Sequence, residues 1–381
     1  MPSSFKKHVH IVSFDIPCPP DYGGVTDVFY KIRALTQSGI NVHLHCYEYG
    51  RKRSLTLEKS CYRVNYYKRQ SGLSYLFRAD PYIVVTRNSS ELFENISRDN
   101  YPVIYEGLHT TLFSNNKELS DRIQVVRMHN REPEYYTSLW NNSGSLPRKL
   151  YFRLEAMKLM RYEKKLNHNL AIACISGGDT AYFRKEYGSM FRAIEHIPPF
   201  HGNSAVQSIP GKGGYVLYHG NLSVCENERA VLFILNKIAA RIDVPFVIAG
   251  KNPGRKIINA SACSKNVKLI SNPDEAGMNH LLMNARIHLL PAENVSGVKL
   301  KLLNSLYTGR HCIVNNAMIK NTGLDELCHI AENPDDFINL ISKLFHRAIT
   351  YGELKRREMV LDGTYSNSSS VQKLHKLLKF S

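Results

Sequence analysis

Short apolar runs alternate with amphipathic segments through the first half of the chain. Val9 to Phe14 and Asn41 to Tyr47 are apolar runs, and the segment between them, Thr26 to Ser38, repeats its apolar positions at helical spacing. Thr26 or Asp27 is expected near the cap of this helix, and Gly39 ends it. The pattern therefore predicts an opening strand, helix and strand. Further runs that end in polar turns are predicted as strands of the same parallel sheet: 82–86, 103–105, 123–127 and 171–175.

A second series of the same kind follows residues 201–214, whose Gly, Pro and Ser content is typical of a linker. A helix is predicted over 226–241, and Asn272 and Pro273 are expected to cap and start another that runs to Ala285. The amphipathic stretch 370–380 is predicted as a last helix. The predicted strands of this half are 215–219, 245–249, 267–271, 287–290 and 312–315.

These patterns predict an α/β protein with two doubly wound Rossmann-like domains facing a cleft. The first domain is expected over 1–200, the linker over 201–214 and the second domain over 215–345. The final segment, 346–381, is expected to be helical and to pack back on the first domain. In such sheets, ligands bind at the carboxyl ends of the strands.

Composition restricts the partners. At 381 residues with 43% hydrophobic content, the chain is long enough for two domains, and 50 Lys and Arg against 33 Asp and Glu give a net charge of +17. This excess favours anionic partners such as nucleotide diphosphates, lipid headgroups or nucleic acid. Because the basic residues are spread over both halves and no RNA-recognition signature occurs, a nucleic-acid partner is not expected.

The sequence also indicates the cellular compartment of the protein. The eight cysteines contain no CxxC pair and are expected to be reduced. Lys6 and Lys7 precede an apolar stretch too short for a signal-peptide core, and no run of 18 apolar residues follows. We therefore expect a cytoplasmic protein, either free or peripheral at the inner face of the membrane.

The segment 291–314 carries the most specific chemistry. A tight turn opens a lysine-bearing helix that Gly309 closes before the next strand. A helix N-terminus offers unpaired N–H groups and about half a positive charge. Gly297 lets the backbone approach a ligand and Lys299 adds a full charge, so the turn suits a diphosphate. Lys301 lies about 200° around the helix from Lys299 and is expected to face water.

Four segments together resemble a known family. They are TyrGlyGlyValThrAspValPheTyrLysIleArgAlaLeuThrGlnSerGly at 22–39, ArgMetHisAsnArgGluProGluTyrTyr at 127–136, TyrHisGlyAsnLeuSerValCysGluAsn at 218–227, and the segment 291–314. The chain resembles the GT-B glycosyltransferases, particularly the family-4 group and its bacterial polysaccharide-assembly members, over nearly its whole length.

The resemblance implies transfer of a sugar from a nucleotide-diphosphate donor to an acceptor hydroxyl. It also implies that the anomeric configuration of the transferred sugar is retained. The acceptor is expected to be a saccharide or lipid-linked saccharide of the cell surface. One departure favours another function: Ser296 and Asn304 stand where typical members carry two glutamates. The alternative is therefore a non-catalytic protein that binds a nucleotide sugar or saccharide on the same fold.

The donor-side residues are expected in the second domain. Lys299 is predicted to balance the charge that builds on the leaving diphosphate, and it is the predicted catalytic residue there. Lys251 follows Gly250 at a strand end and is predicted to reach the same phosphates, although a plain turn explains it too. The remaining predicted donor contacts are Gly220, Asn221, Glu293, Ser296, Gly297 and Asn304.

The acceptor-side residues are expected in the first domain. Gly23 and Gly24 lack dinucleotide-fingerprint spacing, and the resemblance makes them a flexible loop under the donor phosphates. His109 and His129 each follow a strand-like run, and His129 matches the family histidine that contacts the transferred sugar. Asn130 follows it, as does Glu132.

Glu132 has three candidate roles: capping the next helix, orienting His129, or acting as general base. An inverting reaction needs a base, for which Glu132, Glu106 and His129 are the candidates. In a retaining reaction the leaving phosphate can receive the proton itself.

Two further expectations concern metal and membrane. No Asp-x-Asp occurs and no His or Cys residues show zinc spacing, so no catalytic metal and no cofactor besides the nucleotide-sugar co-substrate are predicted. The segment 147–166 is both basic and apolar. It is predicted as a helix, which either packs at the protein surface or lies on an anionic bilayer.

Overall fold

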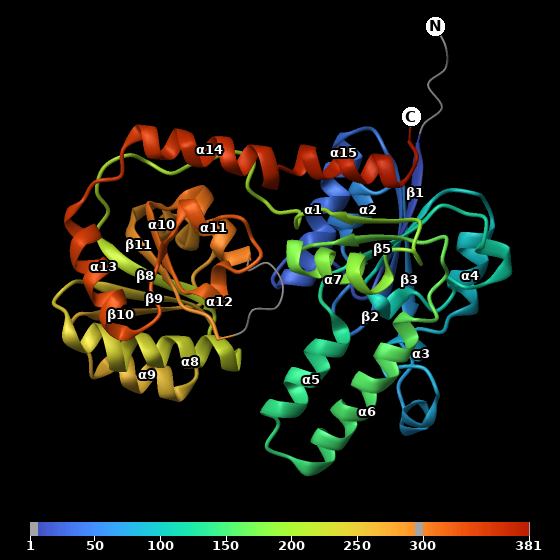
Figure 1. The fold of residues 1–381 in the computed structure, drawn as a ribbon, viewed down its shortest axis with the longest axis horizontal. Coiled ribbons are helices and arrows are strands. Elements are labelled where there is room, and N and C mark those ends of the chain that lie inside the picture. Colours follow the sequence, from blue (N-terminus) through green and yellow to red (C-terminus); the bar gives the residue numbers. More distant parts are fainter. Residues whose placement is uncertain (1–6, 294–299, 381) are drawn as a thin grey trace, which may run out of the picture. The chain divides into compact units, whose positions relative to one another are not determined.

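The computed structural model describes residues 7–293 and 300–380, which fall into two compact units (Figure 1). The chain passes from the first unit to the second between Gly202 and Asn203, and it returns to the first between Thr364 and Tyr365. Each unit is a parallel sheet covered by helices, so the predicted α/β class with two doubly wound units is confirmed.

The sheet of the first unit has the strand order β3-β2-β1-β4-β5-β6-β7 in the described residues, and every neighbouring pair is parallel. The order reverses direction between β1 and β4, which makes the carboxyl ends of these strands the expected ligand edge. The strands are β1 His8–Ser13, β2 Asn41–Glu48, β3 Arg63–Lys68, β4 Val103–Glu106, β5 Gln124–Met128, β6 Ala171–Cys174 and β7 Ala193–His196.

The helices of the first unit are α1 Gly23–Gln37, α2 Leu55–Ser60, α3 Tyr82–Val85, α4 Ser90–Ser97, α5 Glu132–Asn142, α6 Leu146–Glu163, α7 Gly177–Tyr187 and α15 Asn367–Leu377, with short 3-10 turns η1 Leu73–Phe77, η2 Leu108–Thr110 and η3 Lys117–Leu119. The prediction for α1 was wrong at its start, because the helix begins at Gly23 rather than at Thr26. The Thr26 hydroxyl donates to the Tyr22 carbonyl from within the first turn, at 2.8 Å, and does not cap.

The prediction of a strand at 82–86 was also wrong, since this run forms the single helical turn α3. Pro81 stands before the turn, and the backbone N–H of Tyr82 donates to the Glu155 carboxylate of α6 at 2.7 Å. A carboxylate at a helix N-terminus stabilises the helical conformation. This tertiary contact outweighs the strand preference of the branched residues that follow.

The second unit is built on the order β10-β9-β8-β11-β12-β13, again parallel throughout its described residues. Its order reverses between β8 and β11. The strands are β8 Tyr215–Asn221, β9 Phe246–Lys251, β10 Val267–Ser271, β11 Ala285–Leu290, β12 His311–Val314 and β13 His329–Ile330. The helices are α8 Cys225–Phe233, α9 Arg255–Ala262, α10 Glu275–Asn284, α11 Leu300–Thr308, α12 Asn316–Ile319, α13 Pro334–His346 and α14 Tyr351–Tyr365.

The cap of α10 differs from the prediction. Asp274, rather than Asn272, is the N-cap, and its carboxylate accepts from the Gly277 N–H at 2.7 Å. Asn272 instead takes a left-handed conformation, with φ of 52°, and its side-chain oxygen accepts from the Asn252 N–H. The asparagine therefore stabilises the neighbouring turn, and the helix begins later than predicted.

The last helix belongs to the first unit. Apolar residues of α15 and just after it, including Val371, Leu374 and Leu377, join the buried cluster formed by α1 and one face of β1 and β2. In Figure 1, α15 runs beside α1. The spacing of these residues is that of an amphipathic helix, which is why the sequence predicts it.

Candidate active site

Helix α1 carries two charged residues on its buried face. Asp27 and Lys31 are four residues apart, one turn of helix, and they lie among Val28, Ile32 and Leu35. Both are about 1% exposed or less, and the Lys31 ammonium lies 3.1 Å from an Asp27 oxygen. Charges are rarely buried in this way unless other groups complete their bonding.

Strands β4 and β5 supply those groups at their carboxyl ends. Glu106 ends β4, and its two carboxylate oxygens lie 2.7 and 2.8 Å from the Lys31 ammonium. Arg127 of β5 donates from Nε and Nη2 to the two oxygens of Asp27, at 3.0 and 2.8 Å. The Phe200 N–H adds a further bond to Asp27, at 2.8 Å. We call Asp27, Lys31, Glu106 and Arg127 the buried charge network.

The network balances two carboxylates against two cations. Burial alone would raise the pKa of Asp27, but Arg127 and Lys31 together hold that pKa well below its usual range. Asp27 therefore stays ionised in the folded protein. The result is a rigid, charge-neutral arrangement at the edge of the sheet where ligands are expected.

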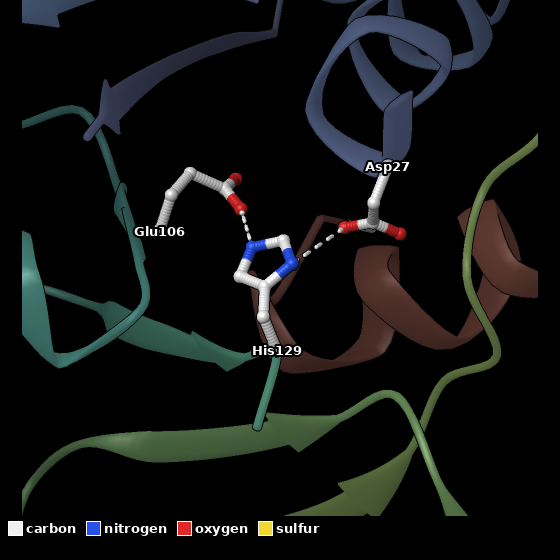
Figure 2. A group of neighbouring side chains, drawn as sticks. All are labelled: Asp27, Glu106 and His129. Atoms are coloured by element: carbon white, nitrogen blue, oxygen red, sulfur yellow. Dashed lines mark hydrogen bonds and ion pairs between the residues drawn. The ribbon is translucent and has the colours of Figure 1, made fainter. Parts of the chain in front are cut away.

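His129 is attached to this network (Figure 2). It directly follows β5, is 7% exposed, and its Nε2 lies 2.9 Å from Glu106 while its Nδ1 lies 3.9 Å from Asp27. An ionised carboxylate only accepts hydrogen bonds, so we assign the proton to Nε2, which donates to Glu106. Since 3.9 Å is too long for a hydrogen bond, the Nδ1 edge keeps bonding capacity for another group.

His109 lies in the same region. Phe14, which follows β1, contacts the rings of both His109 and His129 at centroid distances of 5.5 Å. Gly107 precedes His109 with φ of 69°, and a side chain there would come within 2.8 Å of the His109 ring. Burial and the nearby Arg87 hold the pKa of His109 well below its usual range. The structure thus brings His109 and His129 together, as the sequence suggested.

The other predicted acceptor-side residues of this unit are Gly23, Gly24 and Asn130. Gly23 and Gly24 form the first positions of α1, and a Cβ at Gly24 would come within 2.8 Å of the Phe14 ring. Asn130, partly buried, follows His129. The prediction of a flexible loop at Gly23 and Gly24 was therefore wrong, because both glycines lie in the first turn of α1.

Asp27, Glu106 and His129 are also placed so that one ligand atom from each lies within 4.8 Å of the others. This spacing would suit a metal ion. However, the Lys31 ammonium and the Arg127 guanidinium already donate to the two carboxylates. A metal would have to displace a buried cation, so the donor set does not fit one well, and metal independence stays a prediction.

Glu132 occupies a different environment. It begins α5, but Arg131 is the N-cap and no side chain caps this helix, so the capping role was wrong. Glu106, not Glu132, hydrogen-bonds His129. Burial, and then the nearby Glu163 carboxylate, raise the pKa of Glu132 to about 7, whereas Arg87 and Asn130 act in the other direction. Burial likewise raises the pKa of Glu163 to about 7.

This carboxyl pair predicts a pH-dependent stability. In the unfolded chain the ordinary pKa is 4.5, so between pH 4.5 and about 7 the folded state binds more protons than the unfolded state. The free energy of unfolding should therefore fall as pH rises through this range, by roughly 2 to 3 kcal/mol per carboxyl. The double variant Glu132→Gln/Glu163→Gln should lose this decline, as measured by denaturant unfolding at about pH 5 and about pH 8.

The matched control is Glu134→Gln, which removes an exposed carboxyl of the same helix and should keep the wild-type decline. An equally steep decline in the double variant would show that these carboxyls are ionised at neutral pH.

The predicted donor residues of the second unit cluster at two strand ends. Gly220 and Asn221 end β8, and Lys251 ends the neighbouring β9 with an exposed side chain. The register pairs Asn221 with Lys251. A Cβ at Gly250 would come within 1.8 Å of the Gly220 carbonyl oxygen, so glycine is required for the two strand ends to approach.

The remaining predicted donor-side residues are Glu293, Ser296, Gly297, Lys299 and Asn304. Glu293 follows β11 and pairs with Arg229 of α8 at 2.7 Å, with both groups about half exposed. Asn304 of α11 accepts from the Asn203 amide at 2.9 Å. The predicted positions Ser296, Gly297 and Lys299 lie outside the described residues.

The prediction that Lys301 faces water was wrong. Its ammonium donates to Asn227 at 2.8 Å and to the Tyr218 hydroxyl at 3.2 Å, and it lies over the Tyr218 ring. The side chain of Lys301 is partly buried because α11 packs on the sheet. Helical spacing alone did not reveal that this face of α11 meets Tyr218.

Solved structures share this architecture over nearly the whole chain. The Anabaena protein HepE, in complex with UDP and glucose, matches with a TM-score of 0.65 and 10% identity, covering 98% of this chain and 99% of HepE. The lipopolysaccharide outer core galactosyltransferase WaaB matches at 0.64 with 13% identity, covering 98% and 99%. The chain has the GT-B fold. Staphylococcus aureus TarM adds a third GT-B match, at 0.62 with 10% identity and coverage of 98% and 99%.

Comparison of the amino-acid sequence with other proteins finds one distant relative and no family. No family model matches the chain. An uncharacterized 44.6 kDa protein in the cps region of Klebsiella pneumoniae is 24% identical over 330 residues, covering 82% of this chain and 84% of the relative. The GT-B fold therefore rests on structural likeness, and the activity has to be argued from the site.

Sequence reasoning missed Asp27, Lys31 and Arg127 as members of the site. The sequence nevertheless contains a feature that indicates them. Asp27 and Lys31 are charged residues on the apolar stripe of a predicted helix, and Arg127 is a charged residue within an apolar strand. Charges at predicted core positions indicate a paired, functional or positioning cluster.

Proposed function

We propose that this chain is a glycosyltransferase that moves a sugar from a nucleotide-diphosphate donor to an acceptor hydroxyl. The observation that carries the proposal is His129, held by a balanced buried charge network at the carboxyl end of β5 in a GT-B fold. A histidine fixed in this way can hydrogen-bond a sugar whose charge changes during transfer. The likeness to HepE, solved with UDP and glucose, supports a nucleotide sugar as donor.

We propose the second unit as the donor side. Lys251, Gly220 and Asn221 would meet the nucleotide diphosphate at the paired ends of β8 and β9. From the sequence, Lys299 and the Gly297 turn would stabilise the leaving diphosphate. In this mechanism the leaving diphosphate accepts the proton of the acceptor hydroxyl, so no separate base is required. We therefore propose transfer of a hexosyl group with retention of its anomeric configuration.

The acceptor is proposed to be a saccharide or lipid-linked saccharide of the cell surface. The 24% identical relative in a cps region supports this assignment, as does the likeness to the lipopolysaccharide outer core galactosyltransferase WaaB. Among the described residues, no helix has the length and apolar character needed to cross a membrane. A lipid-linked acceptor would therefore be reached by peripheral contact, which we propose at the inner face of the membrane.

Thermal-shift titration with a panel of nucleotide sugars tests the donor assignment. A ligand that binds only the folded state raises the unfolding temperature as its concentration rises. We expect one nucleotide sugar to produce a saturable increase, with a smaller increase from its nucleoside diphosphate. Binding without turnover would favour the non-catalytic alternative suggested by Ser296 and Asn304. No binding by any nucleotide sugar would contradict the glycosyltransferase and leave only the saccharide-binding form of the alternative.

Lys251→Ala is expected to raise the donor Michaelis constant about tenfold and to change turnover little, because a charge-assisted bond to the bound phosphates stabilises ground and transition states alike. Steady-state kinetics with varied donor measure this. Lys268→Ala, which removes an exposed lysine of the neighbouring strand β10, is the matched control. A fall in turnover at an unchanged Michaelis constant would argue against phosphate binding by Lys251.

A further inference from the structure

The helical hairpin of α5 and α6 exposes an apolar face. In Figure 1 the two helices extend away from the sheet of the first unit. On α6, the residues Leu146, Leu150 and Leu154 are 80%, 61% and 44% exposed, and Met160 continues the series at 47%. Leu146, Leu150 and Leu154 are four residues apart, and Met160 follows Leu154 by six; at about 100° per residue all four fall on one side of the helix. The opposite side, including Ala156 and Leu159, is buried.

The short turn η1 lies beside α6 and adds to this face. The Lys158 ammonium of α6 donates to the Leu76 carbonyl of η1 at 2.7 Å. Leu73 and Phe77 of the same turn are 78% and 89% exposed. We call Leu73, Phe77, Leu146, Leu150, Leu154 and Met160 the hairpin surface.

The charges that α6 brings to the hairpin surface are basic, and the exposed carboxylates nearby, Glu134 of α5 and Asp80 after η1, are paired with Arg131 and Lys165. From Leu146 to Leu166 the chain has seven lysines and arginines and two glutamates, and both glutamates, Glu155 and Glu163, are buried. Arg153 and Arg161 are exposed between the apolar residues. An exposed helix face that combines leucines with basic residues, and whose own glutamates are buried, complements an anionic bilayer.

From this geometry we infer that the hairpin surface docks on a membrane containing anionic lipid, with the leucines in the interface and the arginines on headgroup phosphates. The inference rests on the proposed function, since it explains how a lipid-linked acceptor would be reached. A second copy of the chain is a poor occupant, because it would bring the same basic face from a molecule of net charge +17.

The chain supplies its own reporter for this contact. Trp140 of α5 is the single tryptophan in the sequence, and the Arg153 guanidinium lies 5.3 Å from its ring centroid. Tryptophan emission shifts to shorter wavelength when the ring leaves water for a lipid interface. Titration of the full chain with vesicles of equimolar phosphatidylcholine and phosphatidylglycerol should therefore shift Trp140 emission. Phosphatidylcholine vesicles should give about a tenfold weaker response, and salt should weaken the anionic response.

Two double variants separate the apolar and charged contributions. Leu150→Ser/Leu154→Ser and Arg153→Gln/Arg161→Gln should each lower the vesicle partition coefficient about tenfold, as measured by co-sedimentation. The controls are Ile258→Ser/Met359→Ser and Lys265→Gln/Lys268→Gln, which change exposed residues of the second unit and should bind as wild type. Thermal shift by the donor should stay normal in all four variants, which separates this test from that of the proposed function.

Three outcomes would overturn the inference. Wild-type protein that fails to bind anionic vesicles would do so, and so would equal binding to phosphatidylcholine alone. A wild-type dimer in solution that becomes monomeric in the leucine variant, without vesicle binding, would assign the hairpin surface to a second copy.

Discussion

Replacing Lys31 with methionine should lower the free energy of unfolding by about 3 to 5 kcal/mol, the cost of leaving a buried charge without its partner. Lys31 is fully buried, and among the described residues it is the one lysine or arginine that forms an ion pair with Glu106. Without it, Glu106 keeps only the bond from His129, whereas Asp27 keeps Arg127 and the Phe200 N–H. Denaturant unfolding at neutral pH measures the change.

Two further variants make this result specific. Lys165→Met removes an exposed partner of Asp80 and should cost about 1 kcal/mol or less. The double variant Lys31→Met/Glu106→Gln removes both charges and should recover part of the loss, because no carboxylate is then left uncompensated. A loss below about 1 kcal/mol in the single variant would mean that Lys31 does not hold the network together.

His129→Ala should lower turnover by about a hundredfold to a thousandfold, the usual cost of losing a group that stabilises the transition state. Nucleotide affinity should change little, because the predicted nucleotide contacts lie on the second unit. The fold should survive, since Glu106 keeps the Lys31 ammonium, and the stability cost should be about 1 kcal/mol for one lost hydrogen bond. Single-turnover rate, nucleotide affinity and unfolding temperature are the three measurements.

The control is His168→Ala, which removes an exposed histidine of the same unit and should leave all three quantities unchanged. A His129→Ala protein that unfolds more easily but turns over normally per folded molecule would make His129 a structural residue. In that case His109, which shares the Phe14 contact, becomes the residue to test.

The edge strand β10, Val267–Ser271, was predicted with its actual bounds although it is only partly buried. Strands β4, β5 and β6 were predicted within one residue at each end, because a mainly apolar run between turns is typical of a buried central parallel strand. Strand β3, Arg63–Lys68, was not predicted. It lies at the sheet edge, has exposed charges at both ends, and shows no such run.

The candidate site was predicted only where residues follow strands. Glu106, His109 and His129 could be placed on one edge because parallel strands end together. The charged residues that hold Glu106 and His129 in place depend on which face of α1 meets the sheet. Packing between elements that are distant in sequence decides this. Lys31 and Glu106 are 75 residues apart, and Asp27 and Arg127 are 100 apart. Helical spacing likewise predicted wrongly that Lys301 faces water, whereas the packing of α11 brings it to Tyr218 and Asn227.

Product formation is the most direct test of glycosyl transfer. The full chain is incubated with each nucleotide sugar in turn and with a lipid extract of the source cells, and released nucleoside diphosphate and glycosylated lipid are measured by mass spectrometry. With wild-type protein, one donor should yield the two products in equal amounts, and His129→Ala should nearly abolish both. Saturable binding of a nucleotide sugar with no product from any donor would contradict the enzyme and leave a binding protein on the GT-B fold.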